Sequence, residues 1–127
     1  MPGFNVPILN LTQHPATDAQ IDAGVVNLND ADLVDLKNAL NFNEPPHRLE
    51  MIRRRKAIMD IASKYDSLVV MLGGAPYLCT ELDLCFSLDG YTVLYSFSKR
   101  VSIEFTDSKT GEVTKTNVFK HIGWVKS

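Results

Sequence analysis

The stretch that most constrains this chain runs through residues 67–104, where four patterns follow one another. Residues 68–72 are continuously apolar, as is typical of a buried strand, and a glycine-rich break follows at residues 73–76. Residues 77–88 then predict a helix, and residues 91–106 alternate with the period of a strand. The stretch therefore predicts a strand–turn–helix–strand unit of an α/β domain, and it is the part of the chain that we expect to hold a ligand.

The remaining elements continue this alternation of strands and helices. Before the central unit, the sequence predicts a strand at residues 6–11, a short helix at 17–24, a second short strand at 25–28, and helices at 29–41 and 47–64. After it, residues 107–111 predict a turn and residues 112–119 a returning strand, which makes a β-hairpin with the long alternating run.

This order of elements predicts the fold class. We expect a single domain over residues 1–127 with an α/β fold, a Rossmann-like αβα sandwich. Its central sheet should be mostly parallel, with a C-terminal antiparallel β-hairpin at one edge.

Composition excludes several classes of function. The 127 residues carry a formal net charge of -2, so electrostatics gives no reason to expect strong binding to DNA or RNA. No run of about 18 apolar residues is present, and residues 1–4 lack the basic start of a signal peptide. With two cysteines at non-pairing helical positions, the chain is expected to be cytoplasmic and not attached to a membrane.

The glycine-rich break is the most informative motif. Glycines at 73 and 74 let the backbone turn sharply, and Pro76 suits the first position of a helix. A helix N-terminus attracts anions. We therefore expect a phosphate to bind at the backbone of Gly73, Gly74 and Ala75 and at the amide of Tyr77. The break lacks both common phosphate-binding patterns, GxxxxGK and GxGxxG, so a tight turn without a ligand is the alternative.

A polar cluster follows the first strand. Its members are Asn10, Thr12, Gln13 and His14. If the first strand runs parallel to residues 68–72, the cluster lies beside the glycine-rich break, and His14 is a candidate acid, base or phosphate ligand. The alternative is turn and capping chemistry before the next helix.

Three polar residues on one face of the long strand are further candidates. Ser96, Ser98 and Arg100 suit contacts to phosphate or ribose, although such a face can also be only the solvated side of a hairpin. His121 could join this cluster or lie in a dimer contact, and alternation places it on the face opposite Trp124.

Arg55 lies within the apolar face of its predicted helix. It therefore needs a partner, either a ligand phosphate or a structural carboxylate such as Glu81 or Glu104.

The sequence predicts neither a metal site nor a bound cofactor. Three dispersed histidines and two helical cysteines fit no metal-ligand spacing. No nucleophile stands beside an obvious base in the sequence.

Several blocks of sequence resemble those of a family of small bacterial and phage proteins. They are NLTQHPAT at residues 10–17, GGAPYL at 73–78, LYSFSKRVS at 94–102 and VFKHIG at 118–123. The resemblance covers most of the chain in order, and it implies kinship without an activity.

A looser, fold-level resemblance is to CRISPR-associated Rossmann-like domains, which include the ring nucleases. That resemblance implies a dimer that binds cyclic oligoadenylates across the carboxyl ends of its sheet and in some cases cleaves them.

These observations lead to a functional hypothesis with open alternatives. We expect a domain that binds a nucleotide or phosphorylated small molecule, with a cyclic nucleotide messenger of phage defence or counter-defence as the preferred class. If it cleaves, His14 and Arg100 are the expected catalytic residues of a metal-independent phosphodiesterase. The alternatives are a non-enzymatic sensor or sponge, a protein that forms a homodimer or higher homo-oligomer through its hairpin, and a hydrolase or transferase acting on a phosphorylated metabolite.

Overall fold

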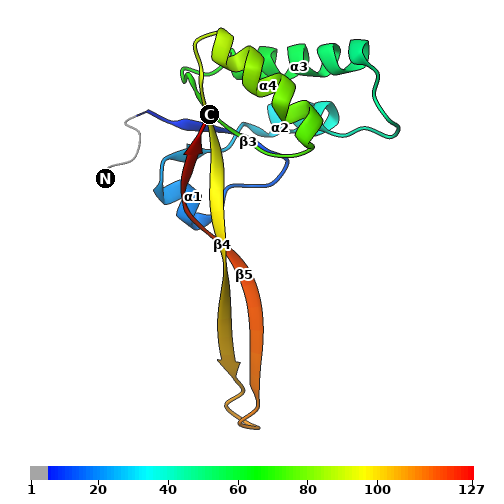
Figure 1. Ribbon diagram of the computed structural model, residues 1–127. Helices are drawn as coiled ribbons and strands as arrows, with labels where there is room; N and C mark the ends of the chain where they lie inside the picture. Colours follow the sequence, from blue (N-terminus) through cyan, green and yellow to red (C-terminus); the bar gives the residue numbers. More distant parts are fainter. Residues whose placement is uncertain (1–5) are drawn as a thin grey trace.

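The computed structural model describes residues 6–127 and contains one five-stranded sheet (Figure 1). Its strands are β1 (Ile8–Leu11), β2 (Val25–Val26), β3 (Val69–Leu72), β4 (Thr92–Thr106) and β5 (Val113–Lys126). Their order across the sheet is β2-β1-β3-β4-β5, with the first four strands parallel and β5 antiparallel to β4. The predicted α/β class, mostly parallel sheet and C-terminal hairpin are confirmed.

Four helices flank the sheet, and their order along the chain is the one that the sequence predicts. They are α1 (Asp18–Asp22), α2 (Asp30–Leu40), α3 (Arg48–Ala62) and α4 (Pro76–Leu88). The three longer helices pack on one face of the sheet, whereas α1 lies on the other side, beside β5 (Figure 1). Within residues 6–127 no helix combines the length and the apolar character that crossing a membrane requires.

Local side chains determine where the helices begin. The Thr17 hydroxyl accepts the Gln20 N–H, and the Gln20 side chain accepts the Thr17 N–H, which makes the predicted capping box. Asn29 caps α2 by accepting the Asp32 N–H at 2.8 Å. Pro76 occupies the first turn of α4, where its missing N–H has no helical partner to lose.

The main core lies between the sheet and the three longer helices. Its buried side chains come from β1, β3 and β4 on the sheet side and from α2, α3 and α4 on the other, with Leu36, Ile58 and Phe86 fully buried. A smaller apolar cluster on the opposite face of the sheet includes Met71 and Leu94, with Trp124 packed against it. Both faces of β3 are therefore covered, which explains its continuous apolar sequence.

The strand β4 pairs with β3 only at its start. Its parallel pairing with β3 joins Val69 to Thr92 and Met71 to Leu94, and β3 ends at Leu72. Beyond that point β4 continues with β5 alone, so the hairpin projects from the carboxyl edge of the sheet (Figure 1). We call residues 98–121 of this projection the arm.

A β-bulge at the base of the arm corrects one prediction. One extra residue, Ile122, interrupts the pairing of β5 with β4 between the Phe97 and Ser98 positions. His121 and Trp124 consequently lie on the same face, with their ring centroids 4.4 Å apart. The prediction that they face opposite ways was wrong, because alternation within one strand does not reveal an inserted residue.

Truncation of a core residue on α2 tests this packing. Leu36→Ala should lower the free energy of unfolding by about 2–5 kcal/mol, because Leu36 is 0% exposed and the substitution leaves a cavity. Val34→Ala is the matched control, since Val34 lies on the same helix at 58% exposure and should change stability by about 0.5 kcal/mol or less. Urea unfolding of both variants measures the difference, and equal losses would contradict the orientation of α2.

Candidate ligand site at the carboxyl edge of the sheet

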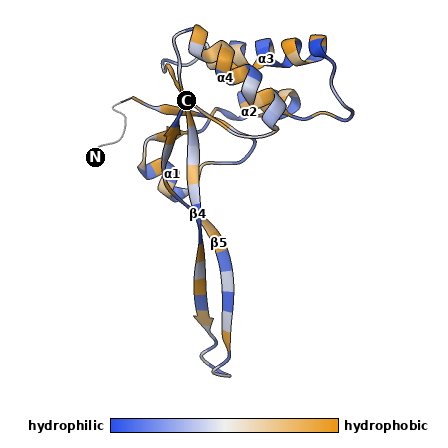
Figure 2. Ribbon diagram, in the orientation of Figure 1, coloured by the Kyte–Doolittle hydropathy of each residue, from blue (hydrophilic) through white to orange (hydrophobic). Residues whose placement is uncertain are grey.

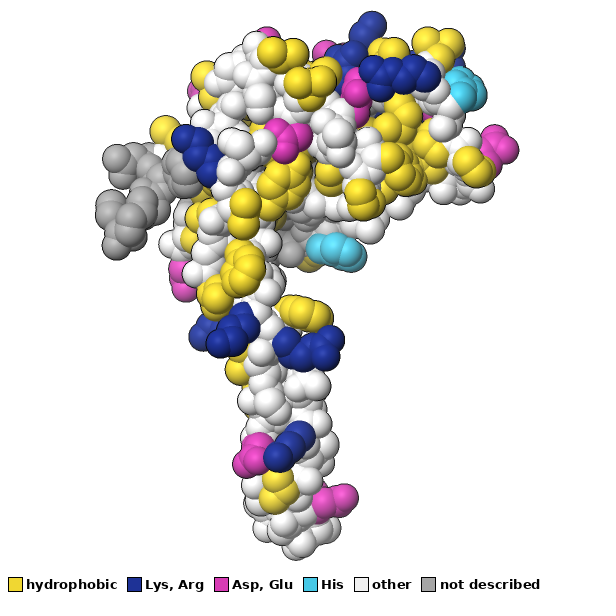
Figure 3. Space-filling view, in the orientation of Figure 1, with side chains coloured by type: hydrophobic (Ala, Val, Ile, Leu, Met, Phe, Trp, Pro, Cys, Tyr) yellow, Lys and Arg dark blue, Asp and Glu magenta, His cyan; other side chains and the backbone are white. Residues whose placement is uncertain are grey.

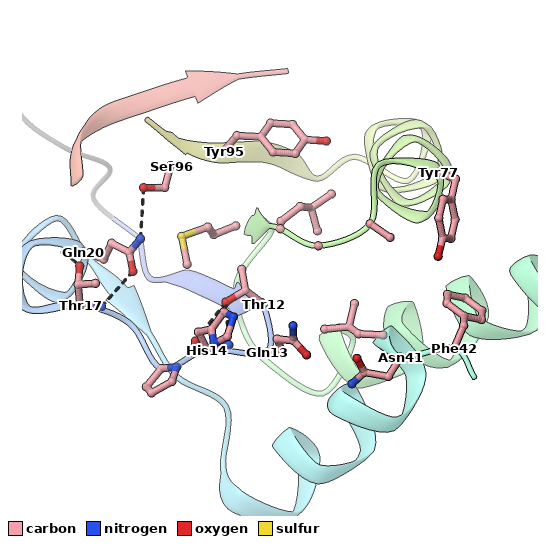
Figure 4. A pocket seen from close by; sticks show the side chains of 17 residues that line it. Thr12, Gln13, His14, Thr17, Gln20, Asn41, Phe42, Tyr77, Tyr95 and Ser96 are labelled. Atoms are coloured by element: carbon pink, nitrogen blue, oxygen red, sulfur yellow. Dashed lines mark hydrogen bonds between the residues drawn. The ribbon is translucent and has the colours of Figure 1, made fainter. Parts of the chain in front are cut away.

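A cavity of about 650 Å³ lies at the carboxyl ends of β1 and β3 (Figure 4). From β1 the chain passes to β2 on one side, and the later strand β3 pairs on the other side. The loops after β1 and β3 therefore diverge, which opens a crevice at the topological switch point of the sheet. The cavity lining comprises Thr12, Gln13, His14, Pro15, Thr17, Gln20, Leu40, Asn41, Phe42, Met71, Leu72, Gly73, Gly74, Ala75, Tyr77, Tyr95 and Ser96.

Asn10 fixes the shape of the loop after β1. This side chain is 3% exposed, and its amide donates to the His14 carbonyl at 2.8 Å and to Asn27 Oδ1 at 2.9 Å. Its Oδ1 accepts both the backbone N–H and the hydroxyl of Thr12. Asn10 is thus a positioning residue beneath the cavity, and the exposed side chains of Gln13 and His14 are held at its surface.

The loop after β3 approaches the loop after β1 closely. A Cβ on Gly73 would stand 3.0 Å from Thr12 Cγ2, so a larger residue there would push the two loops apart. Gly74 has φ +124°, and a Cβ there would meet nothing within 4 Å. The N-terminus of α4 follows at once, and Ala75 caps it without a side-chain hydrogen bond. Pro76 has no N–H, and the Leu78 N–H donates to the Ala75 carbonyl at 3.1 Å, so the Tyr77 N–H is the amide of this first turn that a bound anion could reach.

Ser96, at the base of the arm, connects three elements. Gln20 from α1 donates to its hydroxyl at 3.2 Å, and the hydroxyl lies 2.5 Å from Nδ1 of His121 on β5. Ser98 Oγ lies 3.4 Å from the Ser96 hydroxyl. His121 is 8% exposed, and this burial lowers the pKa of His121 below its ordinary value of 6.5, which favours the neutral ring.

The cavity itself carries no fixed charge. None of its lining residues is Asp, Glu, Lys or Arg, so no carboxylate would repel a bound anion. Cations stand close by along the chain, because Lys99, Arg100 and Lys120 follow at the base of the arm.

The structure brings eight of the predicted site residues together around the cavity. They are Thr12, Gln13, His14, Gly73, Gly74, Ala75, Tyr77 and Ser96. Asn10 lies beneath the loop, Ser98 is adjacent to Ser96, and Arg100 stacks on the Phe119 ring with 5.4 Å from its Cζ to the ring centroid. His14 and Arg100, the two predicted catalytic residues, are therefore not both in the lining.

Arg55 belongs to a separate ion-pair cluster, which corrects its assignment to the site. Its Nε lies 3.3 Å from Glu81 Oε1, while Arg48 donates to Glu81 Oε2 at 2.8 Å. The hydrogen bond from Arg48 is the main cause that lowers the pKa of Glu81, opposed by burial of that carboxyl. Arg55 thus takes its predicted structural alternative and does not line the cavity.

Sequence reasoning missed two parts of the site. The sequence left open that His121 joins the cluster of Ser96 and Ser98, but it did not indicate the direct contact of the Ser96 hydroxyl with the imidazole, because the bulge at Ile122 is not visible in the sequence. Asn41 and Phe42 lie where the predicted helix over residues 29–41 ends, and they were not among the predicted site residues, yet they form one wall of the cavity (Figure 4).

The chemistry available at this cavity is that of hydrogen bonding and proton transfer. Across residues 6–127 no group of three or more His, Cys, Asp or Glu side chains is arranged to hold a metal ion. Hydroxyl, amide and imidazole groups from three loops converge beside the aromatic rings of Phe42, Tyr77 and Tyr95. Such a mixture suits an organic ligand with both planar and polar parts.

The fold and the cavity define an α/β protein with a ligand crevice at the switch point of an open, mostly parallel sheet. The chain belongs to the family described as Uncharacterized protein MJ1673, whose model matches residues 7–125. No match was found among curated proteins or among solved structures.

The burial of His121 gives a prediction for the pH dependence of stability. Because its folded pKa lies below the unfolded value near 6.5, its contribution is complete above that value and is lost as the pH falls through the folded pKa. We expect the free energy of unfolding to fall more for the wild-type chain than for His121→Gln between about pH 7.5 and about pH 5. Urea unfolding at several pH values measures this, and an equal decline in both proteins would contradict a buried, neutral ring.

Proposed function

We propose that this protein binds a nucleotide or another phosphorylated small molecule in the cavity at the carboxyl edge of its sheet. The observation that carries the proposal is the coincidence of the cavity with both the switch point and the uncapped N-terminus of α4. A phosphate would accept hydrogen bonds from the amides around Gly74 and Ala75, with His14 as a further donor.

The dimensions and lining of the cavity support a nucleotide over a bare anion. A volume of about 650 Å³ lies within the range of organic ligand sites, roughly 300–1,000 Å³. Phe42, Tyr77 and Tyr95 offer ring faces for a base, and Thr12 and Ser96 offer hydroxyls for ribose or phosphate.

Within that class we prefer a cyclic oligonucleotide messenger, acting in phage defence or counter-defence. The fold-level resemblance to CRISPR-associated Rossmann-like domains supports this choice. Arg100 also supports it, because Arg100 lies on the same face of β4 as Ser96, and a ligand with several phosphates could extend from the cavity toward it.

Cleavage of that ligand is a second candidate function, favoured by the contact between Ser96 and His121. A neutral His121 would accept a proton, through Ser96, from the ribose 2′-hydroxyl that attacks the neighbouring phosphorus. The P–O5′ bond breaks, the leaving 5′-oxygen takes a proton from water, and a 2′,3′-cyclic phosphate end forms. The backbone amides at Gly74 and Ala75 would stabilise the charge that develops on the phosphoryl oxygens. This scheme uses His121 in place of the His14 and Arg100 pair.

Ligand binding is tested by thermal unfolding in the presence of cyclic di-, tri- and tetranucleotides. At 100 times its dissociation constant a ligand stabilises by about 2.7 kcal/mol, which raises the melting temperature by several degrees. Gln13→Glu should weaken binding by about tenfold or more, because it adds a negative charge to the cavity with little change in shape.

Asn43→Asp is the matched control for that variant. Asn43 is exposed on the loop after α2, and its substitution adds the same charge outside this cavity. The variant should therefore bind the nucleotide with the affinity of the wild-type chain. The proposal fails if no nucleotide changes the melting temperature, or if both variants weaken binding equally.

Cleavage is tested with any cyclic nucleotide that binds. His121→Gln should reduce the rate of product formation by about 100-fold or more while binding is retained, and Ser96→Ala should reduce the rate similarly and also weaken binding. His47→Gln is the control, because His47 caps α3 and does not line the cavity. Product formation that depends on His14 and not on His121 would reject this assignment, and binding without any product would identify a sensor or sponge.

A further inference from the structure

The arm stands away from the rest of the molecule (Figure 3). Between residues 98 and 120 every side chain is exposed except that of Val101, which is half-buried. A two-stranded hairpin with no third layer is only marginally stable in water. A partner that covered one face of this arm would therefore stabilise it, and the residues on each face indicate which partner fits.

The two faces of the arm differ in chemistry. One face presents the opposing pairs Val101 with Val118, Ile103 with Thr116 and Phe105 with Thr114. Phe105 is 69% exposed and Ile103 49%. The other face is mainly polar, with Phe119 and Val113 as its exposed apolar side chains, and it includes an ion pair between Lys115 and Glu104 at 3.6 Å. Figure 2 shows the resulting mixture of hydrophobic and hydrophilic residues along both strands. We call the face that carries Val101, Ile103 and Phe105 the apolar face.

Charged residues border the apolar face at both ends, with opposite signs. At the base, Lys99 and Lys120 pair directly across the two strands. Toward the tip, extending the alternation just past the strand ends places Asp107 and Glu112 on the same face. The Asp107 N–H donates to the Glu112 carbonyl at 2.8 Å, and Asp107 Oδ1 accepts the Lys109 N–H at 2.7 Å, so Glu112 is the carboxylate that this turn leaves unengaged. Lysines directly opposite one another repel, and no acidic side chain of residues 6–127 forms an ion pair with either of them.

This arrangement is self-complementary. Lys99 and Asp107 each lie four residues from Ile103, and Lys120 and Glu112 each lie four residues from Thr116. Consider a two-fold axis that lies between two arms, runs across the strands and passes over the Ile103–Thr116 pair. This axis would place the lysines of one arm over the carboxylates of another copy. The same axis would stack the three apolar pairs of both arms on one another, with the roughly 10 Å spacing of packed sheets.

We propose that two copies of this chain associate by packing the apolar faces of their arms together in antiparallel orientation about that axis. The proposal is independent of whether the cavity binds a nucleotide. A second copy is favoured over an anionic lipid surface or a nucleic acid, because those partners would match the lysines and repel Asp107 and Glu112.

Light scattering on the full chain tests the association. The wild-type protein should have twice the mass of one chain at about 100 µM, and Ile103→Glu should reduce it to a monomer by burying a charge in the interface. Ser102→Glu is the matched control, because Ser102 is the next residue on the opposite face and should leave the dimer intact. A monomeric wild-type chain, or equal dissociation by both substitutions, would overturn the proposal.

Charge reversal tests the antiparallel register. Lys120→Glu and Glu112→Lys should each weaken the dimer by about tenfold or more, and the double variant should regain most of that loss. The two positions are eight residues apart in one strand, about 26 Å, so the rescue cannot arise within a chain. Absence of rescue would reject this packing in favour of a parallel arrangement or of pairing through the β5 edge. Circular dichroism confirms that each variant keeps its fold.

Discussion

The parallel pairing of β1 with β3 is the contact on which the candidate site depends. It joins Leu9 to Val70 and Leu11 to Leu72, and so ends both strands at the same level. The loops that follow therefore begin side by side at the sheet edge before they diverge. At their start, a Cβ on Gly73 would already stand 3.0 Å from Thr12 Cγ2. The cavity exists because β1 sends its chain to one side while β3 lies on the other, and its walls are therefore a consequence of strand order.

A second constraint acts through β4, which serves two environments along its length. Its first residues are covered on both faces, and Val93 and Leu94 are consequently both buried. From Ser96 onward only β5 accompanies it, and the side chains change from buried to half-buried and then to exposed. The change marks the position where the strand leaves the body, and Tyr95 and Ser96, which lie at that position, line the cavity.

Much of the fold was predictable because local and non-local signals agree. The capping box at Thr17, the helix start at Pro76 and the turn at residues 107–111 each combine a residue preference with a change of hydrophobic period. The juxtaposition of the loop after β1 with the break after β3 was also predictable, since it requires only that the two strands be parallel neighbours.

What sequence reasoning missed depends on register and on partners distant in the chain. Arg55 needed a partner, but only the packing of α3 on α4 selects Glu81 over a ligand. The face on which His121 lies depends on one inserted residue, Ile122. This insertion leaves no visible break in the hydrophobic pattern of the β5 sequence.

The bulge at Ile122 also connects the two halves of the molecule. Without it, His121 would face away from Trp124 and from Ser96, so the hydroxyl–imidazole contact at the cavity would be lost. The same insertion sets the phase of β5 in the arm, where Thr114, Thr116, Val118 and Lys120 share the face of Val101 and Ile103. One unpaired residue thereby determines both which side chain of β5 contacts Ser96 and which side chains the arm would present to a second copy.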